Sequence, residues 1–123
     1  MSEQPAILVV DDDPVIRMFV CEALSSHGLN AVPASSADEG LDILCSRSDV
    51  SVVITDIVTP GTLDGLGLVS KIRRRWPRLR VIITSGRMPA VAAGNAEGTV
   101  FLAKPFDEID LLGALAAVLA SHA

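Results

Sequence analysis

The stretch Val52-Val53-Ile54-Thr55-Asp56 decides how the chain is interpreted. Its first four residues are apolar or β-branched, which is typical of a strand buried on both faces of a sheet. A carboxylate within such a strand would lose several kcal/mol through desolvation. We therefore expect Asp56 at the carboxyl end of the strand, where open α/β sheets bind ligands. The stretch predicts a buried strand that presents a reactive carboxylate.

Apolar runs of the same kind occur elsewhere in the chain. Residues 7–10, 81–84 and 99–103 are predicted strands, and residues 30–34 form a weaker one. Stretches with helical spacing of apolar residues alternate with them, although residues 87–98 hold at most a short helix. This alternation predicts an α/β fold whose parallel sheet is covered by helices on both faces. We expect one domain over residues 1–123.

Composition limits the classes of protein that fit. Half of the 123 residues are apolar, which excludes a disordered chain, and no run is long enough to cross a membrane. The net charge of −5 argues against nucleic acid as a default partner. The first residues lack a basic signal-peptide region, and we expect Cys21 and Cys45 to be buried free thiols. These features favour the cytoplasm.

One segment departs from this acidic character. Six of the ten basic residues lie beside Trp76-Pro77, at the predicted end of a helix: Lys71, Arg73, Arg74, Arg75, Arg78 and Arg80. A solvated helix end that complements the helix dipole is one interpretation. A docking patch for an acidic partner is the other.

Polar side chains follow four of the predicted strands. Right-handed crossovers bring the carboxyl ends of parallel strands to one edge, which would collect Asp11, Asp12, Asp56, Thr84 and Lys104. Carboxylates this close together do not all remain charged without a cation. Their hard oxygen ligands suit Mg²⁺, or Mn²⁺. The edge is therefore a predicted metal site.

The same groups predict phosphoryl transfer. No His or Cys is expected nearby as a nucleophile, whereas an aspartate accepts a phosphoryl group directly as an aspartyl phosphate. The metal ion would neutralise the transferring oxygens. Lys104 would balance the phosphoryl charge, and Thr84 would donate a hydrogen bond to it. By contrast, Asp13 and Asp107 are expected only to cap helices.

At these residues the chain resembles the receiver domain of two-component response regulators. The matching segments are Ile7-Leu8-Val9-Val10-Asp11-Asp12, Val53-Ile54-Thr55-Asp56, Ile82-Ile83-Thr84-Ser85 and Lys104-Pro105-Phe106. The resemblance covers essentially the whole chain. It implies a flavodoxin-like (βα)5 three-layer sandwich with a parallel five-stranded sheet of order 2-1-3-4-5.

The resemblance also implies a role for each acid. Asp56 would be the phosphoacceptor, and the donor would be a histidine kinase or a histidine phosphotransfer protein. Asp12, Asp56 and the main-chain carbonyl of Val58 would bind Mg²⁺ directly, with Asp11 held through water. The domain would catalyse only its own phosphorylation and dephosphorylation, so it would not be an enzyme in the usual sense.

A conformational switch is implied in the same way. Lys104 would contact the phosphoryl oxygens, Thr84 would move its hydroxyl onto the phosphate, and Phe101 would turn inward in step. The surface of residues 87–98, the strand 99–103 and the last helix would then exchange partners. In the family this is the helix 4–strand 5–helix 5 face, and its downstream protein is not specified by the sequence.

Loops beside the predicted pocket depart from the family pattern. Thr59 stands where methionine is commonest, and the loop 60–65 is one residue longer than usual. Val58 and Gly86 flank the pocket where the family tunes its dephosphorylation, and Ser85 adjoins Thr84. Because no further domain follows residue 123, we expect a stand-alone receiver; a receiver excised from a hybrid histidine kinase is the alternative.

The last helix carries two apolar stripes. Ile109, Leu112, Ala116 and Leu119 share the face that we expect to pack on the sheet. Leu111, Leu115 and Val118 form a second stripe, either a homodimer or partner surface or an ordinary exposed face.

Two other classes compete with the receiver interpretation. A phosphatase of the haloacid dehalogenase type would use Asp11 as nucleophile and Asp13 as acid–base, within an Asp-x-Asp-x-Val motif. That family places its second acidic strand end after the lysine, whereas Asp56 precedes Lys104. A binding module that never takes phosphate is the other rival, and the intact acids and lysine argue against it.

Overall fold

The strands and helices of the protein alternate along the chain in a computed structural model that describes residues 5–57, 65–86 and 98–120. The strands are β1 (Ala6–Val10), β2 (Asn30–Ala34), β3 (Val50–Asp56), β4 (Arg80–Ser85) and β5 (Thr99–Ala103). The helices are α1 (Pro14–Ser26), α2 (Ala37–Ser46), α3 (Gly65–Arg75) and α4 (Glu108–Ala120). The short helix considered for 87–98 falls almost wholly outside the described residues.

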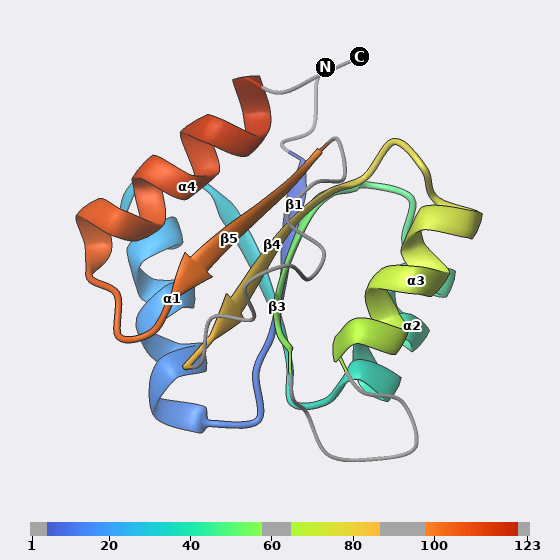
Figure 1. The fold of residues 1–123 in the computed structure, drawn as a ribbon, viewed down its shortest axis with the longest axis horizontal. Coiled ribbons are helices and arrows are strands. Elements are labelled where there is room, and N and C mark those ends of the chain that lie inside the picture. The colour runs from blue at the N-terminus through green and yellow to red at the C-terminus, as the bar shows by residue number, and fades with distance from the viewer. Residues whose placement is uncertain (1–4, 58–64, 87–97, 121–123) are drawn as a thin grey trace.

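All five strands form one parallel sheet in the order β2-β1-β3-β4-β5 (Figure 1). β3 occupies the centre, and Val53 pairs with Leu8 on one side and with Val81 on the other. The predicted fold and strand order are therefore confirmed. The carboxyl ends of the strands share one edge of the sheet, as the crossover rule requires.

Helices cover both faces of the sheet (Figure 1). On one face, α1 and α4 bury residues such as Leu24 and Leu111 against Ile54 and Ile82. On the other face, α2 and α3 bury Leu44 and Ile72 in a separate cluster. Because the central strands lie between these two cores, they carry apolar residues on both faces rather than alternating with polar ones.

Side chains cap the first two helices, and the cap at Asp13 is the one expected from the sequence. Asp13 caps α1, and its Oδ1 accepts from the amide of Val15 at 2.9 Å. Ser36 caps α2 by accepting from the amide of Glu39 at 3.1 Å. Each such cap contributes about 1 kcal/mol to stability.

The last helix corrects the sequence-based expectation. Leu111, Leu115 and Val118, which were predicted to be the second stripe, are buried between α4 and the sheet. Ile109 and Leu119 are 79% and 50% exposed instead. The stripe offered as a homodimer or partner surface is therefore part of the core, and that assignment was wrong.

Other surface features are simpler. Cys45 is exposed, contrary to the prediction, whereas Cys21 is half-buried.

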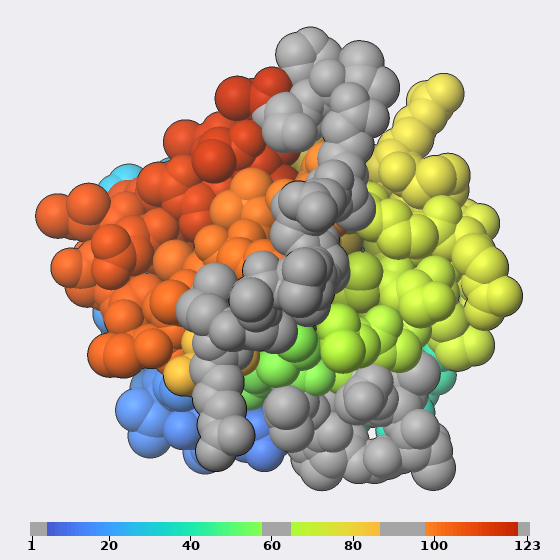
Figure 2. Space-filling model, viewed as in Figure 1, coloured from blue at the N-terminus to red at the C-terminus, as the bar shows by residue number. Residues whose placement is uncertain are grey.

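None of the helices in the described ranges has the length and apolar character needed to cross a lipid bilayer. Figure 2 shows α4 and α3 on opposite sides of the face in view, with α4 in orange to red and α3 in yellow-green.

Candidate functional site

Three carboxylates meet at the carboxyl edge of the sheet. Asp11 and Asp12 follow β1, and Asp56 ends the neighbouring strand β3. One oxygen from each of the three lies within 4.8 Å of the others. The side chains of Asp11 and Asp56 are only 5% and 13% exposed, whereas Asp12 is exposed to solvent. The structure therefore brings together the acids that the sequence predicted to meet.

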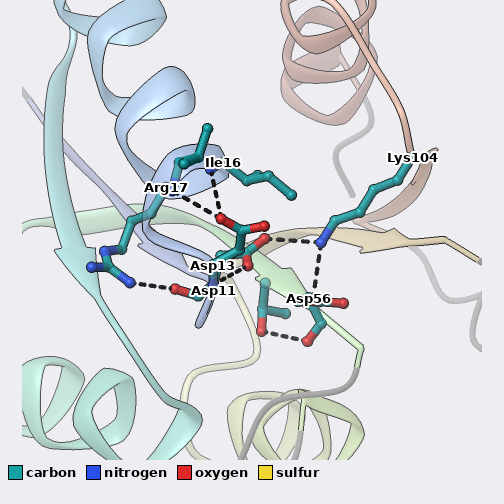
Figure 3. A network of polar contacts seen from close by, with 8 residues as sticks. Asp11, Asp13, Ile16, Arg17, Asp56 and Lys104 are labelled. Carbon is teal, nitrogen blue, oxygen red and sulfur yellow. Dashed lines mark hydrogen bonds and ion pairs between the residues drawn. The ribbon is translucent and has the colours of Figure 1, made fainter.

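Lys104 lies between two of these acids (Figure 3). Its Nζ donates to Asp11 Oδ2 at 3.1 Å and to Asp56 Oδ2 at 3.0 Å. Lys104 directly follows β5, two strands away from β3, and its bond to Pro105 is cis. Burial lowers the pKa of Lys104, but its hydrogen bonds and charge interactions with the two carboxylates outweigh burial and raise the pKa above 10.5. The ammonium therefore remains charged.

Asp11 is the most deeply buried acid of the cluster. Burial raises its pKa above 3.8, although the amide of Asp13 and the charge of Lys104 act in the opposite direction. The amide of Asp13 donates to Asp11 Oδ1 at 2.9 Å. Arg17 of α1 donates from Nη1 to the main-chain carbonyl of Asp11 at 2.7 Å (Figure 3). The backbone at the acid pair is thus fixed from two directions.

Thr84 lies beside Asp56 in the sheet. The two residues are register partners, and the carbonyl of Thr84 accepts from the amide of Ile57 at 3.0 Å. The Thr84 side chain is almost fully buried, and its Oγ1 has no hydrogen-bond partner among the described residues. A buried hydroxyl in this state costs stability unless a ligand or a conformational change satisfies it.

The other predicted residues have varied positions. Ser85 is buried, Gly86 is exposed after β4, and Phe101 is half-buried on β5 against the α2–α3 side of the core. Gly86, Lys104 and Phe106 also line an apolar hollow of about 440 Å³ next to the site. The predictions for Val58 and Thr59 lie outside the described residues.

Two residues that support the site were missed by sequence reasoning. Arg17 binds a main-chain carbonyl, and such a partner leaves no mark in the sequence. Gly65 begins α3 directly against the backbone of Asp56 and Ile57, so a Cβ at this position would overlap it. The glycines of the preceding loop were the available signal, because close backbone approach selects glycine.

The donor set fits a hard divalent cation. Three carboxylates that converge on one point supply oxygen ligands without sulfur or imidazole, as Mg²⁺ prefers. Asp12 leaves one side of the cluster open to solvent. The cluster therefore has room for water and for a phosphoryl oxygen as additional ligands.

Comparison with known families resolves the class of protein. The sequence model of the response regulator receiver domain matches residues 7–116. The chain belongs to this family. The receiver domain is a signalling domain, which removes the phosphatase alternative.

Curated relatives agree with this assignment. The chain is 37% identical over 119 residues to transcriptional regulatory protein GlrR from Escherichia coli. The aligned region covers 94% of this chain and 26% of the relative. It is 39% identical over 117 residues to DNA-binding transcriptional regulator NtrC from Klebsiella pneumoniae, covering 93% and 24%. The chain thus spans about a quarter of the length of the curated relatives it matches.

Solved structures show the same fold. The signal receiver domain of an HD domain-containing protein from Pseudomonas fluorescens superposes with a TM-score of 0.84 at 31% identity over 96% of both chains. The receiver domain of NtrX from Brucella abortus superposes with a TM-score of 0.78 at 34% sequence identity, and the match covers 93% of this chain and 98% of that one. The response regulator TrrA from Thermotoga maritima, solved in complex with Mg²⁺ and BeF, superposes with a TM-score of 0.82 at 26% sequence identity. The match covers 94% of this chain and 99% of that one.

Proposed function

We propose that this receiver domain accepts a phosphoryl group on Asp56 from a phosphohistidine of a histidine kinase or a histidine phosphotransfer protein. The observation that carries the proposal is the convergence of three carboxylates with Lys104 at one sheet edge. In the reaction, a carboxylate oxygen of Asp56 attacks phosphorus, the bond from phosphorus to the donor nitrogen breaks, and the donor leaves.

The chain's own groups have distinct tasks in this reaction. Asp11, Asp12, Asp56 and the main-chain carbonyl of Val58 would hold Mg²⁺ or Mn²⁺, with Asp11 acting through water. The bound ion would neutralise charge on the transferring oxygens. Lys104, which bridges Asp11 and Asp56 in the structure, would exchange Asp56 for a phosphoryl oxygen. No covalent step then requires any other side chain.

Thr84 and Phe101 form the proposed switch. The buried Thr84 hydroxyl lacks a partner among the described residues, so a phosphoryl oxygen at the neighbouring Asp56 supplies the missing acceptor. Movement of Thr84 would free space for Phe101 to turn inward from its half-buried position on β5. The face formed by residues 87–98, β5 and α4 would then exchange its downstream protein. Thr59, Ser85 and Gly86 would set access to the pocket.

We also place this function in the cytoplasm. Cys21 and Cys45 are free thiols, which favours a reducing compartment. The family partners, histidine kinases and phosphotransfer proteins, present their phosphohistidine to receiver domains. We further propose that residues 1–123 act as one receiver domain.

The test uses acetyl phosphate with Mg²⁺. Intact mass should show one added phosphoryl group, and borohydride reduction of the acyl phosphate should map it to Asp56. Asp56→Asn should remove the label, while Asp13→Asn, which changes a helix cap beside the site, should retain it. Labelling of Asp11, or an undiminished signal in Asp56→Asn, would refute the proposal.

A further inference from the structure

A second surface feature lies at the opposite end of the sheet from the acid cluster. Trp76 directly follows α3 and lines two hollows beside Val50, which begins β3, at the amino-terminal edge of the strands. One hollow has a volume of about 470 Å³, and its lining includes Val50, Trp76, Pro77, Leu79 and the side chain of Arg78. The other has about 450 Å³ and shares Trp76, Val50 and Leu79 with the first. We call this pair of hollows the Trp76 groove.

The Trp76 groove lies in the basic segment of an acidic chain. Residues 71–80 hold six of the ten basic residues and no acid, whereas the rest of the chain holds four basic and fifteen acidic residues. Such a separation of charge gives this end of the molecule a positive potential that the net charge of −5 conceals.

Hydrogen bonds within the chain account for the positions of only two of these arginine side chains. Arg73 donates to the carbonyl of Leu79 at 3.3 Å and to Thr99 Oγ1. Arg80 donates to the carbonyl of Val118 at 3.0 Å. Both side chains therefore tie α3 and β4 to their neighbours.

Arg75 and Arg78 instead border the groove. The guanidinium of Arg75 stacks 4.7 Å from the centre of the Trp76 ring, and Arg78 is exposed. Within residues 5–57, 65–86 and 98–120, neither arginine forms an ion pair. The acid that precedes Val50, Asp49, is already held by Arg47 at 2.9 and 2.7 Å. These two positive charges are therefore available to an external carboxylate.

We propose that the Trp76 groove docks an acidic segment of a partner protein, which inserts one apolar side chain beside Trp76 while its carboxylates contact Arg75 and Arg78. The mainly apolar lining of the first hollow fits a side chain, and the arginines that line the two hollows fit carboxylates. A long polyanion such as nucleic acid fits less well, because its charges extend beyond the groove over the acidic remainder of the chain.

The proposal does not depend on phosphorylation of Asp56. The groove is lined by Val50 and Arg80, which begin β3 and β4, whereas the acid cluster lies at the carboxyl ends of the strands, so a partner bound beside Trp76 leaves the carboxyl edge open. The groove would tether the receiver domain to an acidic protein in either phosphorylation state. Failure of one proposal therefore leaves the other intact.

Trp76 provides the assay, because it is the only tryptophan in the chain. The probe is a short synthetic peptide of Asp and Glu with one central Phe, titrated against the full chain in low salt. Binding should shift the Trp76 emission with a dissociation constant of about 100 µM. Replacing the Phe by Ala, or the acids by their amides, should weaken binding about tenfold. Saturating Mg²⁺ should leave the peptide affinity unchanged.

A matched pair of substitutions locates the site. Arg78→Gln removes a charge at the rim, and Arg74→Gln removes the same charge from an exposed position of α3 outside both linings. Arg78→Gln should weaken the peptide about fivefold, and Arg74→Gln less than about twofold. An equal loss of peptide affinity in the two variants, or no change in Trp76 emission at about 1 mM peptide, would overturn the proposal. So would tighter binding of a thymidine oligonucleotide, or self-association that Arg78→Gln abolishes.

Discussion

Substituting Lys104 by methionine removes the ammonium that bridges Asp11 and Asp56 while keeping much of the side-chain volume. Breaking a buried ion pair from one side costs about 3–5 kcal/mol, because the remaining charge stays buried without compensation. The side chains of Lys104, Asp11 and Asp56 are 17%, 5% and 13% exposed, so solvent screens part of the electrostatic interaction between them. We expect Lys104→Met to lower the stability of the metal-free protein by about 2–4 kcal/mol, which is a fall in Tm of about 10 °C.

The same substitution should strengthen Mg²⁺ binding. Without the ammonium bridge, the carboxylates of Asp11, Asp12 and Asp56 repel one another more strongly, so a divalent ion removes more repulsion than in the wild type. Urea unfolding followed by Trp76 fluorescence, with chelator and then with increasing Mg²⁺, measures both effects.

The control is Lys71→Met, which deletes the only other lysine at a half-buried position on α3. This variant should stay within about 0.5 kcal/mol of the wild type and leave Mg²⁺ affinity unchanged. If the two variants are equally stable without metal, or if Lys104→Met binds Mg²⁺ more weakly than the wild type, the electrostatic reasoning is wrong.

Three further predictions concern single residues. Asp11→Asn should raise the Tm of the metal-free protein at neutral pH by about 2–5 °C, because burial raises the pKa of Asp11 and its ionised form disfavours the fold. That gain should shrink as the pH falls through the raised pKa of the native carboxyl, which lies above 3.8, and should vanish below 3.8, where the unfolded chain is protonated as well; a constant gain in thermal melts would contradict the assignment. Gly65→Ala should cost about 2 kcal/mol or more in urea unfolding, because its Cβ would overlap the end of β3, whereas Gly113→Ala in open space on α4 should not destabilise. Cys45 should react with a disulfide reagent at least about tenfold faster than Cys21, whose thiol pKa burial raises; peptide mass spectrometry that finds Cys21 modified first would refute the exposures.

Strands were the most predictable part of the fold. Runs such as 7–10 and 81–83 are apolar at every position, because helices cover both faces of the central sheet. Once the strands were placed, parallel topology alone brought Asp11, Asp56 and Lys104 to one edge. The convergence of the candidate site therefore followed from strand ends and not from any single motif.

The face of α4 was not predictable in the same way. The helix is apolar almost all round, so both the Ile109 stripe and the Leu111 stripe satisfy helical spacing. Only packing against β4 and β5 selects the Leu111 face. Arg17 and Gly65 escaped prediction for a related reason: each supports the site through contact with main-chain atoms, which every residue possesses.

The central position of β3 has a consequence for signalling. Asp56 ends a strand that is hydrogen-bonded to a neighbour on each side, so a phosphoryl group accepted there, as proposed above, would sit on a well-supported backbone. β5 is the last strand of the sheet and, within the described residues, pairs with β4 alone. We therefore expect deformation of the sheet to cost less free energy at β5 than at β3, so that under the proposed function a change in charge at Asp56 would lead to displacement of an edge strand two positions away.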